Sequence, residues 1–179
     1  MLPPSPASPG LTIEQQAIAL VRSGQRDEAL ELIVPVFKRK VFALAYSFTR
    51  NRAEAEDLTQ EVFVKVWKAL PRFDERATLS TWIYAITRNT SVSALRARRE
   101  TCDVEESGAS ADTEGEVERM LLQRLIDQLP ERQRQVVTLF YMQDHSHEEV
   151  SQMLDMPIGT VKTLLHRARE QLRAEVVHD

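Results

Sequence analysis

Cationic and polar side chains recur along one side of a helix predicted near the C-terminus. At about 100° per residue, these side chains lie opposite Val161 and Leu165, where long donors can reach phosphates and base edges. The candidate DNA-contacting residues on this helix are Thr160, Lys162, Thr163, His166, Arg167 and Arg169. A charge run alone favours an ordinary solvated helix face. The elements before the helix favour DNA binding instead.

Those elements have the pattern of a helix-turn-helix. Ser146 and Glu149 form a predicted capping box that starts a short helix, which is expected to end near Asp155. Pro157 and Gly159 are expected to form the turn. The predicted inward residues of the second helix are Val161, Leu164, Leu165, Ala168 and Leu172. Two short helices joined by a tight turn allow the second to enter a major groove.

A second group of candidate DNA contacts lies on a helix predicted over residues 79–99. Its expected inward residues are Leu79, Trp82, Ile83, Ile86, Thr90 and Ala97. The expected outward residues are Tyr84, Arg88, Ser91, Leu95 and Arg98, with Arg96 and Arg99 beside them. Aromatic and cationic side chains interleaved in this way can stack on an unpaired base and follow its backbone. A solvated basic helix remains an equal alternative from these residues alone.

The segment AEAEDLTQEVFVKVWKAL predicts another amphipathic helix. Its core-facing residues are expected to be Leu58, Val62, Val66 and Trp67. The opposite face carries an acidic-polar stripe with one exposed valine, formed by Asp57, Gln60, Glu61, Val64 and Lys68. This stripe suits docking on a basic partner, and an ordinary solvated face is equally compatible with it.

Composition limits the classes of protein to consider. The 179-residue chain is 42% hydrophobic, enough for real cores, and its net charge of −4 restricts any DNA-binding surface to a local region. The single cysteine, Cys102, cannot form an intramolecular disulfide, and no apolar run approaches the roughly 18 residues of a membrane span. We therefore expect a cytoplasmic protein without membrane insertion.

A metal or catalytic site is not expected. The polar cluster His145, His147, Glu148 and Glu149 lacks HExxH spacing and lies at a predicted helix start, where capping explains it. No convergent nucleophile, base or phosphate-binding loop is recognisable. The sequence predicts a non-enzymatic protein with no cofactor and no metal.

The elements that position these residues are all helical. Residues 1–10 form an expected disordered Pro-rich tail, and residues 11–100 an expected domain of about four helices with breaks near Gly24, Asn51 and Pro71–Asp74. An acidic, flexible linker is expected over residues 101–116 and a second helical domain over residues 117–179. Pro130 suits the first turn of a helix in that domain. The predicted fold is all-α with two small domains.

Three strings in order carry a family resemblance: AEDLTQEVFVKVW, STWIYAITRN and LPERQRQVVTLFYMQDHSHEEVSQMLDMPIGTVKTLLHRAREQL. Over roughly residues 14–175 the chain resembles the extracytoplasmic-function sigma factors of bacterial RNA polymerase, in the sigma-70 superfamily. The resemblance implies a sigma factor that directs core polymerase to promoters. Its first domain would be the region 2 bundle and its second the region 4 helix-turn-helix.

The resemblance also implies partners and residue roles. Asp57, Gln60, Glu61 and Val64 would dock on the clamp helices of the polymerase, and region 4 would sit on the flap. Melting and capture of the −10 element would involve Phe73, Asp74, Ser80, Tyr84, Arg88, Asn89, Arg96, Arg98 and Arg99. The C-terminal recognition helix would read the −35 element, and the linker would run toward the RNA exit channel. An anti-sigma factor is an expected partner.

Two positions depart from the family pattern. Leu164 stands where relatives usually carry Arg, so the contact expected there is either absent or moved to Arg167. Asp155 replaces a common turn glycine, and a short polar residue tolerates the left-handed backbone this requires. The alternative function is a stand-alone, dimeric helix-turn-helix regulator. Such a regulator has no need of the stripe and the base-stacking helix in the first domain.

Overall fold

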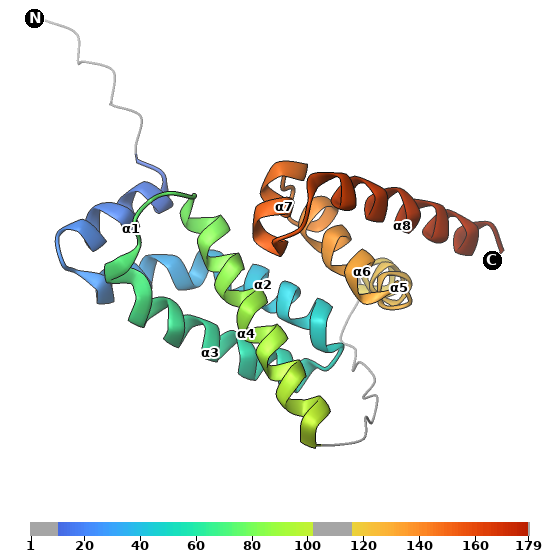
Figure 1. Ribbon diagram of the computed structural model, residues 1–179, viewed down its shortest axis with the longest axis horizontal. Helices are drawn as coiled ribbons and strands as arrows, with labels where there is room; N and C mark the ends of the chain where they lie inside the picture. The colour runs from blue at the N-terminus through green and yellow to red at the C-terminus, as the bar shows by residue number, and fades with distance from the viewer. Residues whose placement is uncertain (1–10, 102–115, 179) are drawn as a thin grey trace, which may run out of the picture.

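A computed structural model describes residues 11–101 and 116–178, with side chains over 11–98 and 122–175. Every regular element in these ranges is helical (Figure 1). The predicted tail over residues 1–10 and Cys102 lie outside the described residues, as does almost all of the predicted linker over 101–116. The all-α prediction is confirmed.

The first domain consists of four helices, as the sequence predicted. They are α1 (Ile13–Arg22), α2 (Arg26–Thr49), α3 (Arg52–Ala69) and α4 (Leu79–Thr101), with a short 3-10 turn, η1 (Leu70–Arg72), after α3. The breaks between them follow from backbone preferences. Gly24 adopts φ +80 between α1 and α2, and Arg50 adopts φ 53 between α2 and α3. The Asn51 side chain then caps α3 by accepting from the Glu54 N–H.

The second domain consists of α5 (Glu116–Asp127), α6 (Glu131–Val137), the π-helical turn η2 (Thr138–Met142), α7 (His147–Leu154) and α8 (Ile158–His178). The Ser146–Glu149 capping box is present, and Asp155 ends α7 in the left-handed region at φ 50, both as predicted. Two details differ. Pro130 is the N-cap of α6, and Gly159 lies in the first turn of α8 because Pro157 already initiates that helix.

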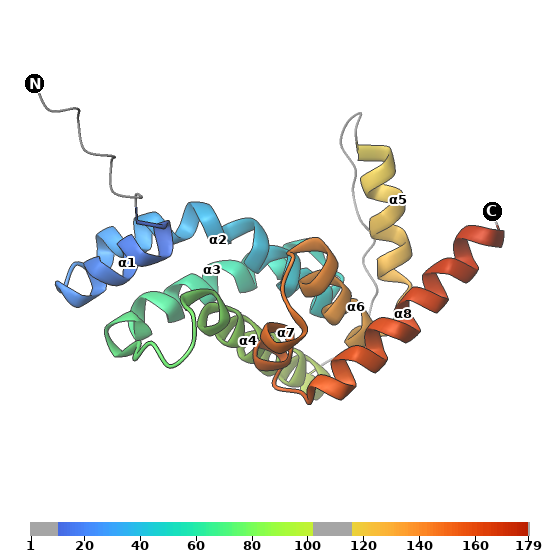
Figure 2. The ribbon, with the colours of Figure 1, turned by 90° about the horizontal axis from the view of Figure 1, so that it is seen from above.

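The two domains share part of their hydrophobic core. One cluster within the first domain joins α1, α2, α3 and α4 around Ile33, Phe37 and Val62. Another cluster includes Leu44 and Tyr84 of the first domain together with many apolar residues of the second. The views in Figures 1 and 2 agree that α7 lies against α4 and α6 lies near α2, while α5 and α8 extend away. The helix-turn-helix is therefore docked on the first domain.

The capping box at α7 gives a stability prediction. Ser146→Ala removes the acceptor for the Glu149 N–H, which lies 3.2 Å from the Ser146 Oγ. We expect the free energy of unfolding to fall by about 1 kcal/mol, measured by urea denaturation followed by circular dichroism. Ser93→Ala, on the exposed side of α4, is the control and should leave stability nearly unchanged. Equal midpoints for Ser146→Ala and the parent would contradict a stabilising cap.

Candidate functional site

The acidic-polar stripe of α3 is exposed, as its spacing predicted. Asp57, Gln60 and Glu61 are exposed, and Val64 is 50% exposed. The opposite side of the helix, with Leu58, Val62 and Val66, is buried and fixes the direction in which the stripe points. Glu61 forms an ion pair with Lys65 one turn later, at 2.7 Å. This surface can accept cationic groups from a partner.

Contacts with α1 and α4 hold the first half of the loop before α4. The Phe73 ring packs against Trp82 with centroids 5.1 Å apart, and Asp74 pairs with Arg76 at 2.9 Å. Arg22 of α1 holds Glu75 through an ion pair of 2.7 Å. The residues predicted here to contact DNA are partly exposed (Phe73, Ser80) or exposed (Asp74). The loop has a defined conformation at one end of α4.

The predicted orientation of Tyr84 is wrong. Its side chain is 0% exposed, and its hydroxyl donates to Gln143 Oε1 of the second domain at 2.6 Å. Ser91 was also predicted outward and is buried, whereas Ala97 was predicted inward and is exposed. The physical reason is that α4 packs on two sides: against its own bundle, and against α7. The buried residues of α4 accordingly cover an arc of roughly 200°.

The other predicted residues of α4 have different surroundings. Arg88 is partly buried; it donates to Asn89 Oδ1 at 2.9 Å and lies 3.7 Å from the Asp155 carboxylate. Arg98 pairs with Glu54 of α3 at 2.9 Å. Asn89 and Arg96 are exposed, and the Arg99 side chain lies outside the described ones. The cationic groups of α4 thus lie on one helix, but Arg88 and Arg98 also interact with other residues of the protein.

The predicted face of α8 is confirmed as exposed. Lys162, Thr163, His166, Arg167 and Arg169 are exposed, and Thr160 is half-buried. Val161, Leu165 and Ala168 form the buried side of α8. Leu164 packs at the edge of the core and presents no charge. His166 lies 3.5 Å from Glu170. The helix offers two Arg side chains and one Lys within two turns, a suitable set for phosphates and guanine edges.

Reasoning from the sequence missed the residues that join the domains. Arg134 of α6 is 5% exposed; its Nε donates to the Ser47 carbonyl of α2 at 2.7 Å, and its Nη1 to the Leu129 carbonyl at 2.8 Å. Burial lowers the pKa of Arg134. Tyr46 of α2 donates to Asp127 of α5 at 3.3 Å, and burial raises the pKa of this phenol. Their sequence positions carry no periodic signal that identifies such contacts.

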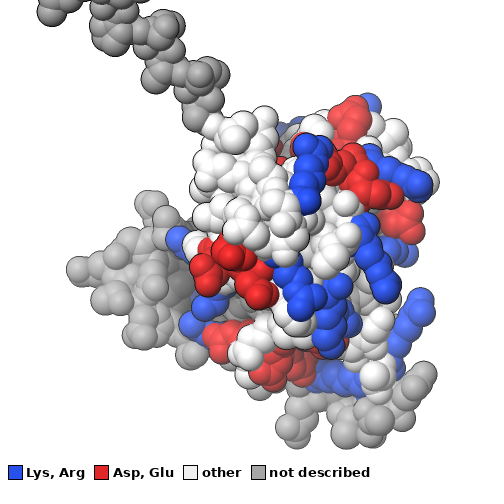
Figure 3. Space-filling model, turned by 90° about the vertical axis from the view of Figure 1, so that its left-hand side faces the viewer, with Lys and Arg blue, Asp and Glu red and all other residues white. Residues whose placement is uncertain are grey.

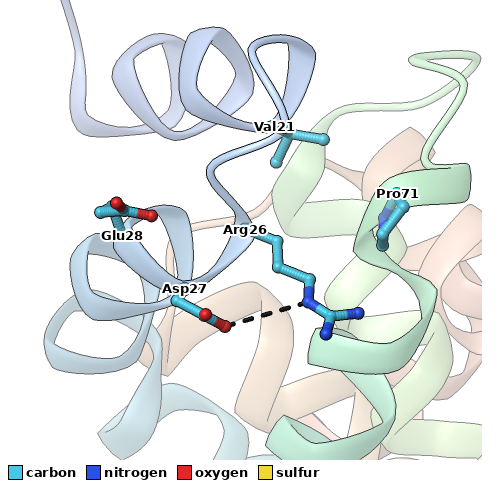
Figure 4. A pocket seen from close by; sticks show the side chains of 6 residues that line it. Val21, Arg26, Asp27, Glu28 and Pro71 are labelled. Carbon is cyan, nitrogen blue, oxygen red and sulfur yellow. Dashed lines mark ion pairs between the residues drawn. The ribbon is translucent and has the colours of Figure 1, made fainter.

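An open pocket of about 450 Å³ lies at the junction of α1, α2 and η1, and Figure 4 shows its lining side chains. It is lined by Val21, Gly24, Arg26, Asp27, Glu28 and Pro71. Arg26 and Asp27 are 3.9 Å apart, and both also contact Trp67: the indole N–H donates to Asp27 at 2.6 Å, and the guanidinium lies 3.7 Å from the ring centroid. The lining includes no Ser, Thr, Cys or His. Arg26 and Asp27 both contact the Trp67 indole.

The surface at the α1 end of the molecule has mixed charge. In Figure 3, cationic and acidic side chains are interspersed on this face and form no continuous basic area among the atoms shown in colour. No group of three or more His, Cys, Asp or Glu residues among the described ones could hold a metal ion. Over the same residues, no helix is long and apolar enough to cross a membrane.

Two helical domains with an exposed acidic stripe, a cationic helix and a helix-turn-helix define a DNA-binding transcription factor. Two family models match the chain: Sigma-70 region 2 over residues 34–101 and Sigma-70 region 4 over residues 119–172. The chain is similar to the ECF RNA polymerase sigma factor SigW of Bacillus subtilis, with 32% identity covering 90% of this chain and 96% of the relative. It is 30% identical to the ECF RNA polymerase sigma-E factor of Escherichia coli, over 91% and 94% of the two chains.

Solved structures share the fold. CnrH in complex with the cytosolic domain of CnrY matches with a TM-score of 0.71 at 23% identity, over 94% of this chain and 99% of that one. The sigma factor RpoE in complex with the anti-sigma factor NepR from Bartonella quintana matches with a TM-score of 0.72 at 23% identity, over 83% and 97%. The chain belongs to the extracytoplasmic-function (ECF) sigma factors of the sigma-70 family.

As a member of this family, the protein is a transcription initiation factor that directs RNA polymerase to specific promoters. Its partners are core RNA polymerase and promoter DNA. The alternative of a stand-alone helix-turn-helix regulator is not favoured, because the family matches include both domains and not the helix-turn-helix alone.

Arg134 gives a prediction about the domain contact. Arg134→Ala leaves the buried carbonyls of Ser47 and Leu129 without their donors, so we expect the free energy of unfolding to fall by about 1 to 3 kcal/mol for each unsatisfied group. Arg132→Ala, exposed on the same helix, is the matched control. Urea denaturation of both variants measures the difference, and equal losses would show that the buried guanidinium does not stabilise the contact.

Proposed function

We propose that three parts of this sigma factor have separate binding roles: α3, α4 together with the loop before it, and α8. The α3 stripe binds core polymerase, the segment from Phe73 to Arg99 engages the −10 element, and α8 reads the −35 element. The observation that carries this proposal is the exposed cationic face of α8 above a buried helix-turn-helix core. A helix held in this way presents its side chains to a major groove at a fixed angle.

The proposed polymerase contact rests on charge and exposure. Asp57, Gln60 and Glu61 are exposed beside Val64, an apolar side chain that is half exposed. A small apolar centre with charged neighbours is the usual composition of a protein–protein contact. We assign this stripe to the clamp helices of the polymerase, and the second domain to its flap.

The proposed −10 contact combines the loop residues Phe73, Asp74 and Ser80 with the polar groups of α4. Arg88, Asn89 and Arg96 are at least partly accessible on α4, and Arg98 and Arg99 extend the basic run. Tyr84 would stack on an unpaired base only after the second domain moves away, since the hydroxyl and ring are covered in this structure. Domain separation is thus part of the proposed mechanism.

The remaining proposals concern partners and context. Two solved relatives are complexes with CnrY and with the anti-sigma factor NepR, which supports an anti-sigma protein as a partner of this chain. The acidic linker over residues 101–116 would follow the RNA exit channel, since its lack of cations suits a path for a polyanion. The protein would act in the cytoplasm, where polymerase and promoter are found, as a non-enzymatic subunit without a cofactor.

The direct test is transcription in vitro with core polymerase on genomic fragments. Addition of the protein should produce transcripts from a limited set of start sites that core polymerase alone does not use. Alignment of the sequences upstream should then reveal two shared elements with a constant spacing. Transcription that does not depend on the added protein would contradict the proposal.

The α3 assignment predicts a loss of polymerase binding. Asp57→Arg combined with Glu61→Arg reverses the charge of the exposed stripe, so affinity for core polymerase should fall at least tenfold, about 1.4 kcal/mol. The melting temperature should stay close to that of the parent because neither side chain is buried. Glu31→Arg, exposed on α2, is the control. Unchanged affinity in a polymerase pull-down would refute the docking assignment.

The α8 assignment predicts altered promoter selectivity. Arg167→Ala or Lys162→Ala should weaken binding to a −35 duplex by about 1 to 3 kcal/mol where a base edge is read, and by less where only phosphate is touched. Glu175→Ala, exposed further along the same helix, is the control. Binding to parent and base-substituted duplexes by fluorescence anisotropy measures the effect. Variants with unchanged preference among these duplexes would show that this face reads no base.

A further inference from the structure

The segment between η2 and α7 connects the second domain to two helices of the first. The Gln143 side chain accepts a hydrogen bond from the Tyr84 hydroxyl at 2.6 Å and donates one to the Lys40 carbonyl at 3.1 Å. One amide therefore binds α4 and α2 at once. The assignment of its oxygen and nitrogen is fixed, because the Lys40 carbonyl can only accept.

His145 lies in the same contact. Its ring packs edge-on against the Tyr84 ring, with centroids 5.1 Å apart and planes at 76°. Its Nε2 is buried and has no hydrogen-bond partner, while its Nδ1 lies 3.9 Å from the Glu149 carboxylate. A protonated imidazole would carry a second N–H at the buried Nε2 with no acceptor in reach, which is costly in an apolar contact.

The charged groups around His145 come from several elements. Burial, the largest effect, lowers its pKa, and Lys40 of α2 lowers it further; Asp144 and Glu149 in its own domain act in the opposite direction. From α4 the facing group is Tyr84, a phenol whose pKa is raised by burial. Further out, Glu14 of α1 interacts with Lys40 and Glu149, and burial raises its pKa. Together these effects favour the neutral form of the His145 imidazole while the domains are docked.

We propose that the segment 143–146 is a pH-sensitive latch: with His145 neutral it holds the second domain over Tyr84, and protonation of His145 releases the two domains from each other. Release uncovers the α4 side chains assigned above to the −10 element, so this consequence rests on the proposed function. Arg88, which lies 3.7 Å from Asp155 of the second domain, is freed by the same movement. Acidification therefore favours the open form.

The direction of the pH effect follows from the linkage between protonation of His145 and docking of the domains. A base whose pKa is lower in the docked form binds fewer protons there, so docking is most stable above the ordinary histidine pKa near 6.5 and weakens as the pH falls below it. The ratio of docked to open molecules changes by up to about tenfold for each unit by which the docked pKa is depressed. Glu14, with a raised pKa, works in the opposite direction and needs its own control.

Domain separation can be measured on the full chain without DNA. Dyes on Lys68→Cys of α3 and Arg173→Cys of α8, both exposed and in a Cys102→Ser background, report the distance by single-molecule energy transfer. We expect one docked population at pH 7.5 and a second, lower-transfer population at pH 5.5. Circular dichroism at both pH values should show unchanged helicity, which separates opening from unfolding.

Variants identify the group that titrates. His145→Gln should abolish the pH response, and Gln143→Ala should populate the open form at both pH values. His147→Gln alters a neighbouring histidine that packs on Phe140 within its own domain, and it should keep the parental response. Glu14→Gln removes the opposing group, so its pH response should be at least as large as that of the parent. The latch is overturned if the parent shows the same population at both pH values, or if His145→Gln responds like the parent.

Binding to single-stranded DNA tests the proposed function of α4 separately from the latch. Binding of single-stranded oligothymidine should be tighter for Gln143→Ala than for the parent at pH 7.5, and tighter for the parent than for His145→Gln at pH 5.5. Opening that occurs as predicted but leaves this binding unchanged would support the latch and refute the assignment of α4 to unpaired DNA.

Discussion

The contact between α4 and α7 determines what the first domain can present to a partner. Tyr84 belongs by sequence to the first domain, yet it is buried in a cluster that includes Val150 and Met153 of α7. Burying an aromatic side chain of this size contributes roughly 1.5 to 3 kcal/mol. The same burial removes an aromatic ring from the α4 surface, so stability of the docked form and availability of that ring oppose each other.

Polar groups give the docking of the two domains its specificity. Arg134 crosses from α6 to the Ser47 carbonyl, and Gln143 crosses to Tyr84 and Lys40. A buried guanidinium is costly to desolvate and is tolerated only where carbonyls occupy its donors, which restricts the domains to one relative position.

The assigned surfaces differ in how closure affects them. The α3 stripe and the cationic face of α8 are exposed while the domains are docked, whereas Tyr84 is covered and Arg88 is partly buried near Asp155. If α3 binds polymerase as proposed, a sigma factor in this form would meet polymerase before its α4 surface is complete. Exposure of that surface then depends on release of the apolar and polar contacts between the domains.

The sequence by itself determined the family, the helical fold, the exposed face of α3 and the start of α7. The spacing of Leu58, Val62 and Val66 fixed the exposed side of α3, and the Ser146 capping box fixed the start of α7, because helix periodicity and capping depend on residues within a few positions. Only the tertiary structure decided the fate of Tyr84 and the roles of Gln143 and Arg134. Tyr84 and Gln143 are 59 residues apart, and Ser47 and Arg134 are 87 residues apart. No local periodicity indicates which side of a helix a distant domain will cover.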